Sequence, residues 1–174
     1  VKYFNINDLN ETLMEEYLEK LPEFMRQEIN RYKIVNDRKT RLIARLMIKQ
    51  YIQKTKYSAT IEDWQKGKNE KPFIPNGPQF NITHSDEMVA VAFNDEPIGI
   101  DIEKMKEVDV EGLSSYLHNE EKEYILTSAN TQDAFFTIWA KKEAYLKATG
   151  KGIGHELTTI SVIEDNIINN QQHW

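Results

Sequence analysis

The sequence predicts an α+β protein, because helix-like and strand-like patterns occupy successive stretches of the chain. Apolar residues recur at helical spacing in residues 8–21 and again in residues 37–51. Between residues 80 and 103 the pattern changes to the polar and apolar alternation that is typical of strands. Helical spacing returns after residue 104, and a strand-like stretch begins at residue 157. The order helices, strands, helices, strands favours α+β.

The first half is expected to begin with helices. Asp8 or Asn10 is suited to cap the helix at residues 8–21, and Pro22 is suited to begin a second, short helix. The helix at 37–51 has one apolar stripe and basic residues on its other faces. Glycine and proline in residues 67–78 predict a loop.

Three strands are expected next, at residues 80–83, 88–93 and 98–103, with a turn at 94–97. The second half then continues with two short helices, around residues 113–117 and 120–126. A long helix follows from Thr131 to Gly150, where the glycine suits a left-handed C-terminal cap. A strand at residues 157–163 and a turn at Asp165–Asn166 lead to one last short strand.

Composition narrows the function classes. The chain has 174 residues, 40% hydrophobic and 29% charged, as in ordinary soluble globular proteins. The absence of cysteine excludes disulfides and thiolate chemistry. No apolar run approaches the roughly 20 residues that a bilayer crossing needs, and residues 1–20 do not resemble a signal peptide. We therefore expect a cytoplasmic protein that does not bind membranes.

Charge is unevenly distributed along the chain. Residues 26–56 contain ten basic side chains and only two acidic ones, although the whole chain has a net charge of −6. This basic segment is either a local anion site or a solvated helix face. Nucleic acid is not expected as a partner, because the acidic remainder of the molecule would repel it.

The segment Ile-Gly-Ile-Asp-Ile-Glu at residues 98–103 places Asp101 and Glu103 on one face of a predicted strand. Two neighbouring carboxylates repel each other, and a hard divalent cation such as Mg²⁺ would relieve that repulsion. Gly99 lacks a side chain on the same face and so leaves room for a ligand. The alternative interpretation is a half-buried strand with a solvated acidic face.

The long predicted helix carries a second charged group. Glu143 and Lys147 lie at i and i+4 and therefore project from one helical face. They form either a surface ion pair or a third metal-binding carboxylate beside a phosphate-binding cation. Trp139, one turn earlier, is expected to anchor the helix in the core.

Together these segments resemble a known family. The sequence IGIDIE, followed after about forty residues by WAKKEAYLK, is similar to the paired signature of the 4′-phosphopantetheinyl transferase superfamily. The sequence FNITHS at residues 80–85 resembles an element of its Sfp-type branch. Lys71-Pro72 matches that branch's GKP element, although Glu70 stands where glycine is usual. The resemblance extends from about residue 20 to residue 160.

The resemblance implies an enzyme that moves 4′-phosphopantetheine from coenzyme A to a serine of an apo acyl or peptidyl carrier protein, releasing 3′,5′-ADP. The residues that match the family's Mg²⁺ ligands are Asp101, Glu103 and Glu143. Glu121 falls where Sfp-type members have another acidic residue near the site. Glu143, Glu121 or a water molecule would accept the serine proton, and the sequence leaves this choice open.

The resemblance also implies a set of coenzyme A contacts. His84 and Lys147 match residues that contact its phosphates, and Lys71 matches a lysine beside the nucleotide. Thr83 occupies the serine or threonine position before the histidine. Cations at the start of the helix, within residues 38–45, would contact the 3′-phosphate.

Sfp-type members resemble two similar α+β halves with coenzyme A in the cleft between them. Here residues 1–103 would form the first half and residues 104–174 the second, which is expected to be incomplete at its C-terminus. Such a pseudo-dimer is expected to be a monomer, and its carrier is expected to serve secondary-metabolite biosynthesis. Two alternatives are a truncated, non-catalytic protein that binds coenzyme A or a carrier, and a Mg²⁺-dependent phosphodiesterase.

Overall fold

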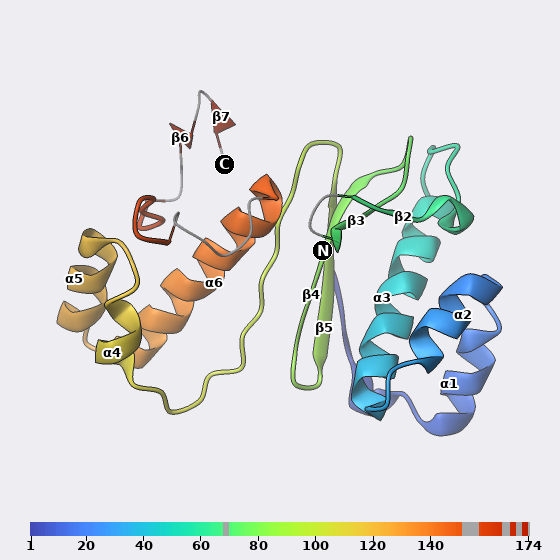
Figure 1. The fold of residues 1–174 in the computed structure, drawn as a ribbon, viewed down its shortest axis with the longest axis horizontal. Helices are drawn as coiled ribbons and strands as arrows, with labels where there is room; N and C mark the ends of the chain where they lie inside the picture. The colour runs from blue at the N-terminus through green and yellow to red at the C-terminus, as the bar shows by residue number, and fades with distance from the viewer. Residues whose placement is uncertain (68–69, 151–156, 165–167, 170–171, 174) are drawn as a thin grey trace. The chain divides into compact units, whose positions relative to one another are not determined.

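A computed structural model of the chain describes residues 1–67, 70–150, 157–164, 168–169 and 172–173. Its helices and small sheets confirm the predicted α+β class. The chain divides into two compact units, Val1–Ile98 and Gly99–Trp174 (Figure 1). Contacts therefore group Gly99–Glu103 with the second unit, whereas the predicted boundary follows residue 103. None of the described helices combines the length and the apolar character needed to span a bilayer.

The first unit contains a three-stranded antiparallel sheet in the order β1-β5-β4. The predicted strands at residues 80–83 and 88–93 are confirmed as β4 (Gln79–Ser85) and β5 (Met88–Asn94). The edge strand β1 (Lys2–Asn5) was not predicted, because four residues are too few to show a clear alternation. It pairs with β5, with Phe4 opposite Val89.

Helix α3 (Val35–Gln53) covers one face of this sheet, and α1 (Glu11–Leu18) and α2 (Glu23–Asn30) pack against α3 (Figure 1). Asn10 is the residue that caps α1, since its side chain accepts a hydrogen bond of 2.9 Å from the Leu13 amide. Pro22 lies at the N-cap of α2, directly before the first helical residue, so the second helix begins where it was predicted.

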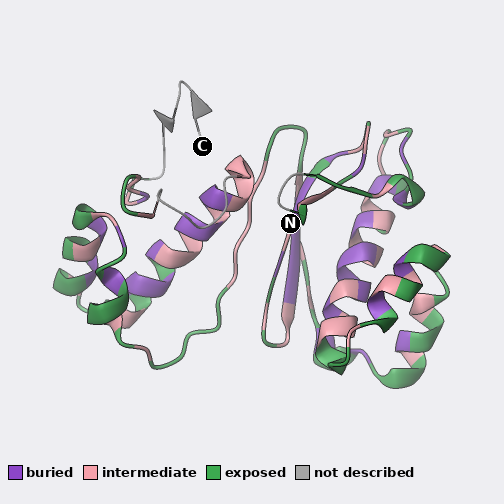
Figure 2. Cartoon of the chain, in the orientation of Figure 1, coloured by how far each residue is buried: buried purple, intermediate pink, exposed green. Residues whose placement is uncertain are grey.

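The core of the first unit lies between α3 and the sheet (Figure 2). Leu42 and Ile48 of α3 and Val89 and Val91 of β5 are completely buried. The loop predicted at residues 67–78 contains one strand of a short hairpin formed by β2 (Gln65–Lys66) and β3 (Pro72–Phe73). Two short 3₁₀ helices, η1 (Ile6–Asp8) and η2 (Ile61–Asp63), complete the first unit.

The second unit is built mainly from helices: α4 (Val110–Ser114), α5 (Asn119–Thr127) and α6 (Thr131–Thr149). The long helix ends as predicted, because Gly150 has a left-handed φ of 69° and its amide bonds to the Leu146 carbonyl. Trp139 packs against the core of this unit, where its ring stacks on Phe135.

The end of the chain differs from the prediction. Residues 157–163 form a turn followed by irregular structure rather than a strand. The physical reason lies at Val162, whose amide donates to the Glu121 carboxylate instead of a neighbouring strand. Asp165 and Asn166, the predicted turn, lie outside the described residues. The last elements are a short hairpin of β6 (Ile168–Asn169) and β7 (Gln172–His173).

Candidate functional site

Gly99 brings the acidic segment of the second unit against α6. A Cβ atom at this position would lie 1.8 Å from the Ala144 carbonyl oxygen and 2.6 Å from the Ala148 amide nitrogen. No residue with a side chain fits such a distance, so only glycine allows this approach. The space beside Gly99 is filled by the helix backbone. The interpretation that it leaves room for a ligand was therefore wrong.

Residues 98–103 do not form the predicted strand. Their alternation instead reflects packing of one irregular segment, in which Ile98, Ile100 and Ile102 are half-buried. The two carboxylates differ in exposure, because the Asp101 side chain is only 5% exposed whereas Glu103 is exposed. They are not an equivalent pair on one strand face.

Lys147 of α6 binds Asp101. Its Nζ lies 2.5 Å from Asp101 Oδ1, and its own side chain remains 31% exposed. The contact joins residues 46 positions apart, which no helical spacing reveals. The sequence placed Lys147 on the same helical face as Glu143, and the Lys147 charge acts on Glu143, while the ion pair that Lys147 forms is with Asp101.

Glu143 is a buried carboxylate next to this ion pair, with 8% of the residue exposed. Burial raises its pKa, Lys147 opposes that rise, and the negative charges of Asp101 and Glu103 add to it. Its Oε1 is buried and accepts no hydrogen bond from any described residue. This burial argues against the alternative of a surface ion pair.

The three predicted metal ligands thus lie within electrostatic reach of one another. Within the described ranges, however, no group of three or more Asp, Glu or His side chains has the arrangement of a metal site. The convergence of Asp101, Glu103 and Glu143 on one ion stays a prediction. Their oxygen donors are of the type that Mg²⁺ prefers.

Glu121 lies in a different network, deep between α5 and α6. It is completely buried, and its Oε2 lies 2.7 Å from Lys142 Nζ. The same Oε2 accepts from the His118 amide at 3.0 Å, while Oε1 accepts from the Val162 amide at 2.8 Å. Burial lowers the pKa of Lys142, and Glu121 partly offsets this effect. Sequence reasoning assigned no role to Lys142, although its place before Glu143 in WAKKEAYLK was a signal.

Two of the predicted coenzyme A contacts lie on β4 of the first unit. Successive residues of a strand point to opposite faces, and here Thr83 is buried whereas His84 is exposed. His84 lies opposite Val89, on the sheet face that packs against α3. Lys71 precedes β3 and is half-buried, and this burial lowers its pKa.

The basic start of α3 reaches the same end of the first unit as His84. Lys39 Nζ contacts the Ile6 carbonyl at 3.4 Å, and the Ile6 amide donates to the Glu87 carbonyl at 2.8 Å. Glu87 lies in the turn that joins β4 to β5. The start of α3 and the turn that follows His84 therefore lie at the same end of the first unit (Figure 1).

The structure separates the basic residues of α3 into two groups. Arg45 is buried, lies 2.7 Å from Glu28, and packs over the Trp64 ring. Arg41 stacks on Tyr32 at 3.7 Å from the ring centroid and remains half-buried. Arg45 therefore stabilises the core of the first unit. The basic residues nearer the start of α3, Arg38 and Lys39, are the candidates for binding a phosphate.

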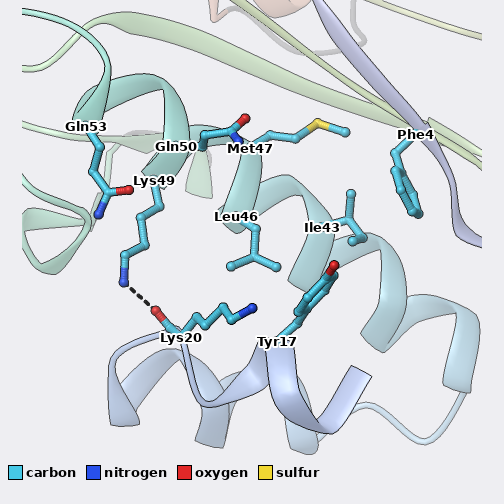
Figure 3. Close-up of a pocket in the computed structure, with 9 residues that line it drawn as sticks. All are labelled: Phe4, Tyr17, Lys20, Ile43, Leu46, Met47, Lys49, Gln50 and Gln53. Carbon is cyan, nitrogen blue, oxygen red and sulfur yellow. Dashed lines mark hydrogen bonds between the residues drawn. The ribbon is translucent and has the colours of Figure 1, made fainter. Parts of the chain in front are cut away.

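A groove of about 530 Å³ lies elsewhere on the first unit, between α1 and α3 (Figure 3). Its walls are mostly apolar, with Ile43, Leu46 and Tyr17 facing the opening and Lys20 and Lys49 at one end. None of the side chains predicted for coenzyme A or metal binding lines it.

Comparison with known families assigns the chain. Residues 10–96 match the N-terminal family of 4′-phosphopantetheinyl transferases, and residues 97–174 match the 4′-phosphopantetheinyl transferase superfamily. The chain belongs to the 4′-phosphopantetheinyl transferase superfamily. The family resemblance that the motifs indicated is thus confirmed.

Several curated relatives are similar to the chain. The 4′-phosphopantetheinyl transferase gsp of Aneurinibacillus migulanus is 38% identical over 73% of this chain and 55% of its own length. For psf-1 of Bacillus pumilus the identity is 31% over 83% of this chain and 66% of the relative. Sfp of Bacillus subtilis (strain 168) is 38% identical over 53% of this chain and 43% of the relative. The chain spans about half the length of the curated relatives it matches.

Proposed function

We propose that this chain transfers the 4′-phosphopantetheine group of coenzyme A to a serine of an apo acyl or peptidyl carrier protein. The observation that carries the proposal is the buried Glu143 carboxylate beside the Asp101–Lys147 ion pair. Membership of the superfamily supports it. The relatives gsp, psf-1 and Sfp are named as 4′-phosphopantetheinyl transferases.

Mg²⁺ is the cofactor that fits these residues by chemistry. Asp101, Glu103 and Glu143 offer only hard oxygen donors, and the buried Oε1 of Glu143 accepts no hydrogen bond within the described part of the chain. When bound, the ion would stabilise the negative charge of the pyrophosphate. Because Lys147 lies on Asp101, a cation at these carboxylates would compete with the ammonium group.

Glu143 is the residue that we assign as proton acceptor. In the chain without metal, burial raises the pKa of Glu143, Asp101 and Glu103 add to the rise, and a raised pKa makes a carboxylate a better base near neutral pH. Because a bound Mg²⁺ would lower this pKa, the role of base requires that Asp101 and Glu103 hold the ion and that Glu143 contacts it only weakly. Glu143 would take the proton of the carrier serine as the serine oxygen bonds to the phosphorus that carries pantetheine. The bond from that phosphorus to the bridging oxygen breaks, and the electron pair leaves with 3′,5′-ADP.

Cations would neutralise the phosphates during this reaction. Lys147 of the second unit is partly exposed and would contact phosphate oxygens, as would the exposed His84 of the first unit. The start of α3, with Arg38 and Lys39, would contact the 3′-phosphate, with Lys71 and Thr83 near the nucleotide. Coenzyme A, a polyanion, then explains the basic segment of an otherwise acidic chain.

The remaining proposals concern the whole protein. We propose that the units Val1–Ile98 and Gly99–Trp174 are the two similar halves expected from the resemblance, so that the boundary lies a few residues before the expected residue 103. The protein would act in the cytoplasm as a monomer, with no nucleic acid or membrane as partner. The acidic composition argues against nucleic acid as a partner, and the absence of cysteine agrees with a cytoplasmic location.

The test is mass spectrometry of an apo carrier protein incubated with the chain, coenzyme A and Mg²⁺. Transfer adds the mass of phosphopantetheine to one serine, and Asp101→Ala is expected to abolish the addition. Binding of coenzyme A or carrier without any added mass would identify a non-catalytic binding protein. Release of phosphopantetheine in the absence of carrier would identify a phosphodiesterase.

A further inference from the structure

Glu121 and Lys142 form the most deeply buried ion pair among the described residues. Their side chains are 0% and 2% exposed, and Glu121 Oε2 lies 2.7 Å from Lys142 Nζ. We propose that this pair positions Glu143 by fixing α6 against α5 and the 160–162 segment, and that Glu121 itself takes no proton. The proposal rests on the proposed transferase function.

Both oxygens of Glu121 are already used inside the protein. Oε2 accepts from Lys142 Nζ and from the His118 amide, and Oε1 accepts from the Val162 amide. A general base must come within hydrogen-bond reach of the proton it removes. A completely buried carboxylate with three internal donors is poorly placed to meet a serine hydroxyl of another protein.

Lys142 connects three parts of the second unit. Its ammonium group lies on Glu121 of α5 and donates to the Ile160 carbonyl, while its backbone belongs to α6. Because Lys142 and Glu143 are successive residues of one helix, fixing the rotation of α6 at Lys142 also fixes the direction of Glu143. The same pair closes the N-terminus of α5, where Glu121 completes a capping box with His118.

The free energy of a buried ion pair depends on both partners being present. Removing one partner of a buried ion pair leaves an uncompensated charge in a medium of low dielectric constant, whereas replacing both partners by neutral groups of similar volume is often tolerated. A positioning pair and a catalytic carboxylate therefore respond differently to double substitution. Neutralising both partners restores a positioning pair and does not restore a missing base.

The test compares Glu121→Gln, Lys142→Met and the double variant Glu121→Gln/Lys142→Met in the carrier-protein assay. Each single variant is expected to lower Tm and to reduce kcat roughly tenfold, as loss of an orienting residue commonly does, with KM for coenzyme A unchanged. The double variant is expected to recover Tm and most of kcat. A double variant with recovered Tm but with kcat as low as that of Glu121→Gln would show that Glu121 is the base and overturn the proposal.

A matched control separates positioning from stability alone. Ile125 lies on α5, one turn beyond Glu121, and is completely buried in the core. Ile125→Ala is expected to lower Tm through a cavity and to leave kcat of the folded protein unchanged. If Lys142→Met also lowers Tm and leaves kcat unchanged, the pair is structural only and the positioning role is refuted.

Hydrogen exchange gives a measurement that does not depend on activity. The Val162 amide donates to Glu121 Oε1, so its exchange is expected to accelerate in Lys142→Met and to slow again in the double variant. Unchanged exchange in Lys142→Met would refute the proposed link to the 160–162 segment. If the wild-type chain transfers nothing, the proposed function fails separately, and the exchange of Val162 still tests that link.

Discussion

Lys142 and Glu143 are neighbours on α6, but their charged groups differ in the hydrogen bonds that they form: the Lys142 ammonium has an acidic side chain and a carbonyl group as partners. The Lys142 ammonium is buried against Glu121 and also donates to the Ile160 carbonyl. The Glu143 carboxylate is also buried, but its Oε1 accepts no hydrogen bond from a described residue, and nearby carboxylates add to the rise in its pKa. Natural proteins usually satisfy buried polar groups. The comparison teaches that α6 carries a satisfied structural charge and, one residue later, an unsatisfied one at the proposed site.

The largest expected effect comes from removing one partner of the buried Glu121–Lys142 ion pair. Lys142→Met leaves the Glu121 carboxylate buried without its cation and is expected to lower the free energy of unfolding by about 3–5 kcal/mol. Urea unfolding at pH 7 measures the change. Glu16→Gln, which breaks the exposed Glu16–Lys20 pair, is the control and is expected to change almost nothing. Equal losses in the two variants would contradict the comparison.

The next effect comes from separating the acidic segment from α6. Gly99→Ala would place a Cβ atom against backbone atoms of Ala144 and Ala148, which cannot move without displacing the helix. We expect a loss of about 1–3 kcal/mol in stability, typical of overpacking. Transfer should fall by about 10²-fold, because a displacement of roughly 1 Å at a catalytic group has such an effect. Wild-type activity in Gly99→Ala would show that the close approach does not position Asp101.

The smallest effect on stability is expected at Glu143, whose carboxylate Oε1 accepts no hydrogen bond from a described residue. There, removing the charge is expected to stabilise the protein rather than destabilise it. Burial raises the pKa of Glu143 above the ordinary value of 4.5, so the folded state binds its proton more tightly than the unfolded chain does. This group therefore makes the protein less stable as pH rises from 4.5 through the raised pKa, and the penalty stays constant above that value.

Glu143→Gln removes this penalty. The variant is expected to have a higher Tm than the wild type at pH 7, and the gain should disappear below pH 4.5, where Glu143 is protonated in both states. Thermal unfolding across this pH range measures it. A gain that grows as pH falls would mean that the sign of the shift is wrong.

The sequence predicted the long regular elements and missed the contacts between distant residues. The helix ending at Gly150 was predicted well, because its periodicity is long and its cap is a local signal. Residues 98–103 were misassigned as a strand, since the alternation of IGIDIE is satisfied by packing on α6. Nothing local distinguishes that packing from pairing in a sheet.

The sequence proposed residues for the candidate site, but it did not reveal the contacts between them. Asp101, Glu143 and Lys147 were found from two short motifs, but the Asp101–Lys147 contact joins residues 46 positions apart. Glu121 was grouped with the catalytic residues, and its partner Lys142 was given no role. The burial of Glu121 and Lys142 is what suggests a structural role for them. That burial depends on the packing of α5 against α6, which the sequence does not reveal.

The most direct test of the account is the mass of an apo carrier protein after incubation with coenzyme A, Mg²⁺ and either the wild-type chain or Glu143→Gln. The account predicts that the wild type adds phosphopantetheine to one serine, while the variant, which is folded and more stable at pH 7, adds none in the same time. Equal rates of addition by the two proteins would contradict the assignment of Glu143 as the proton acceptor.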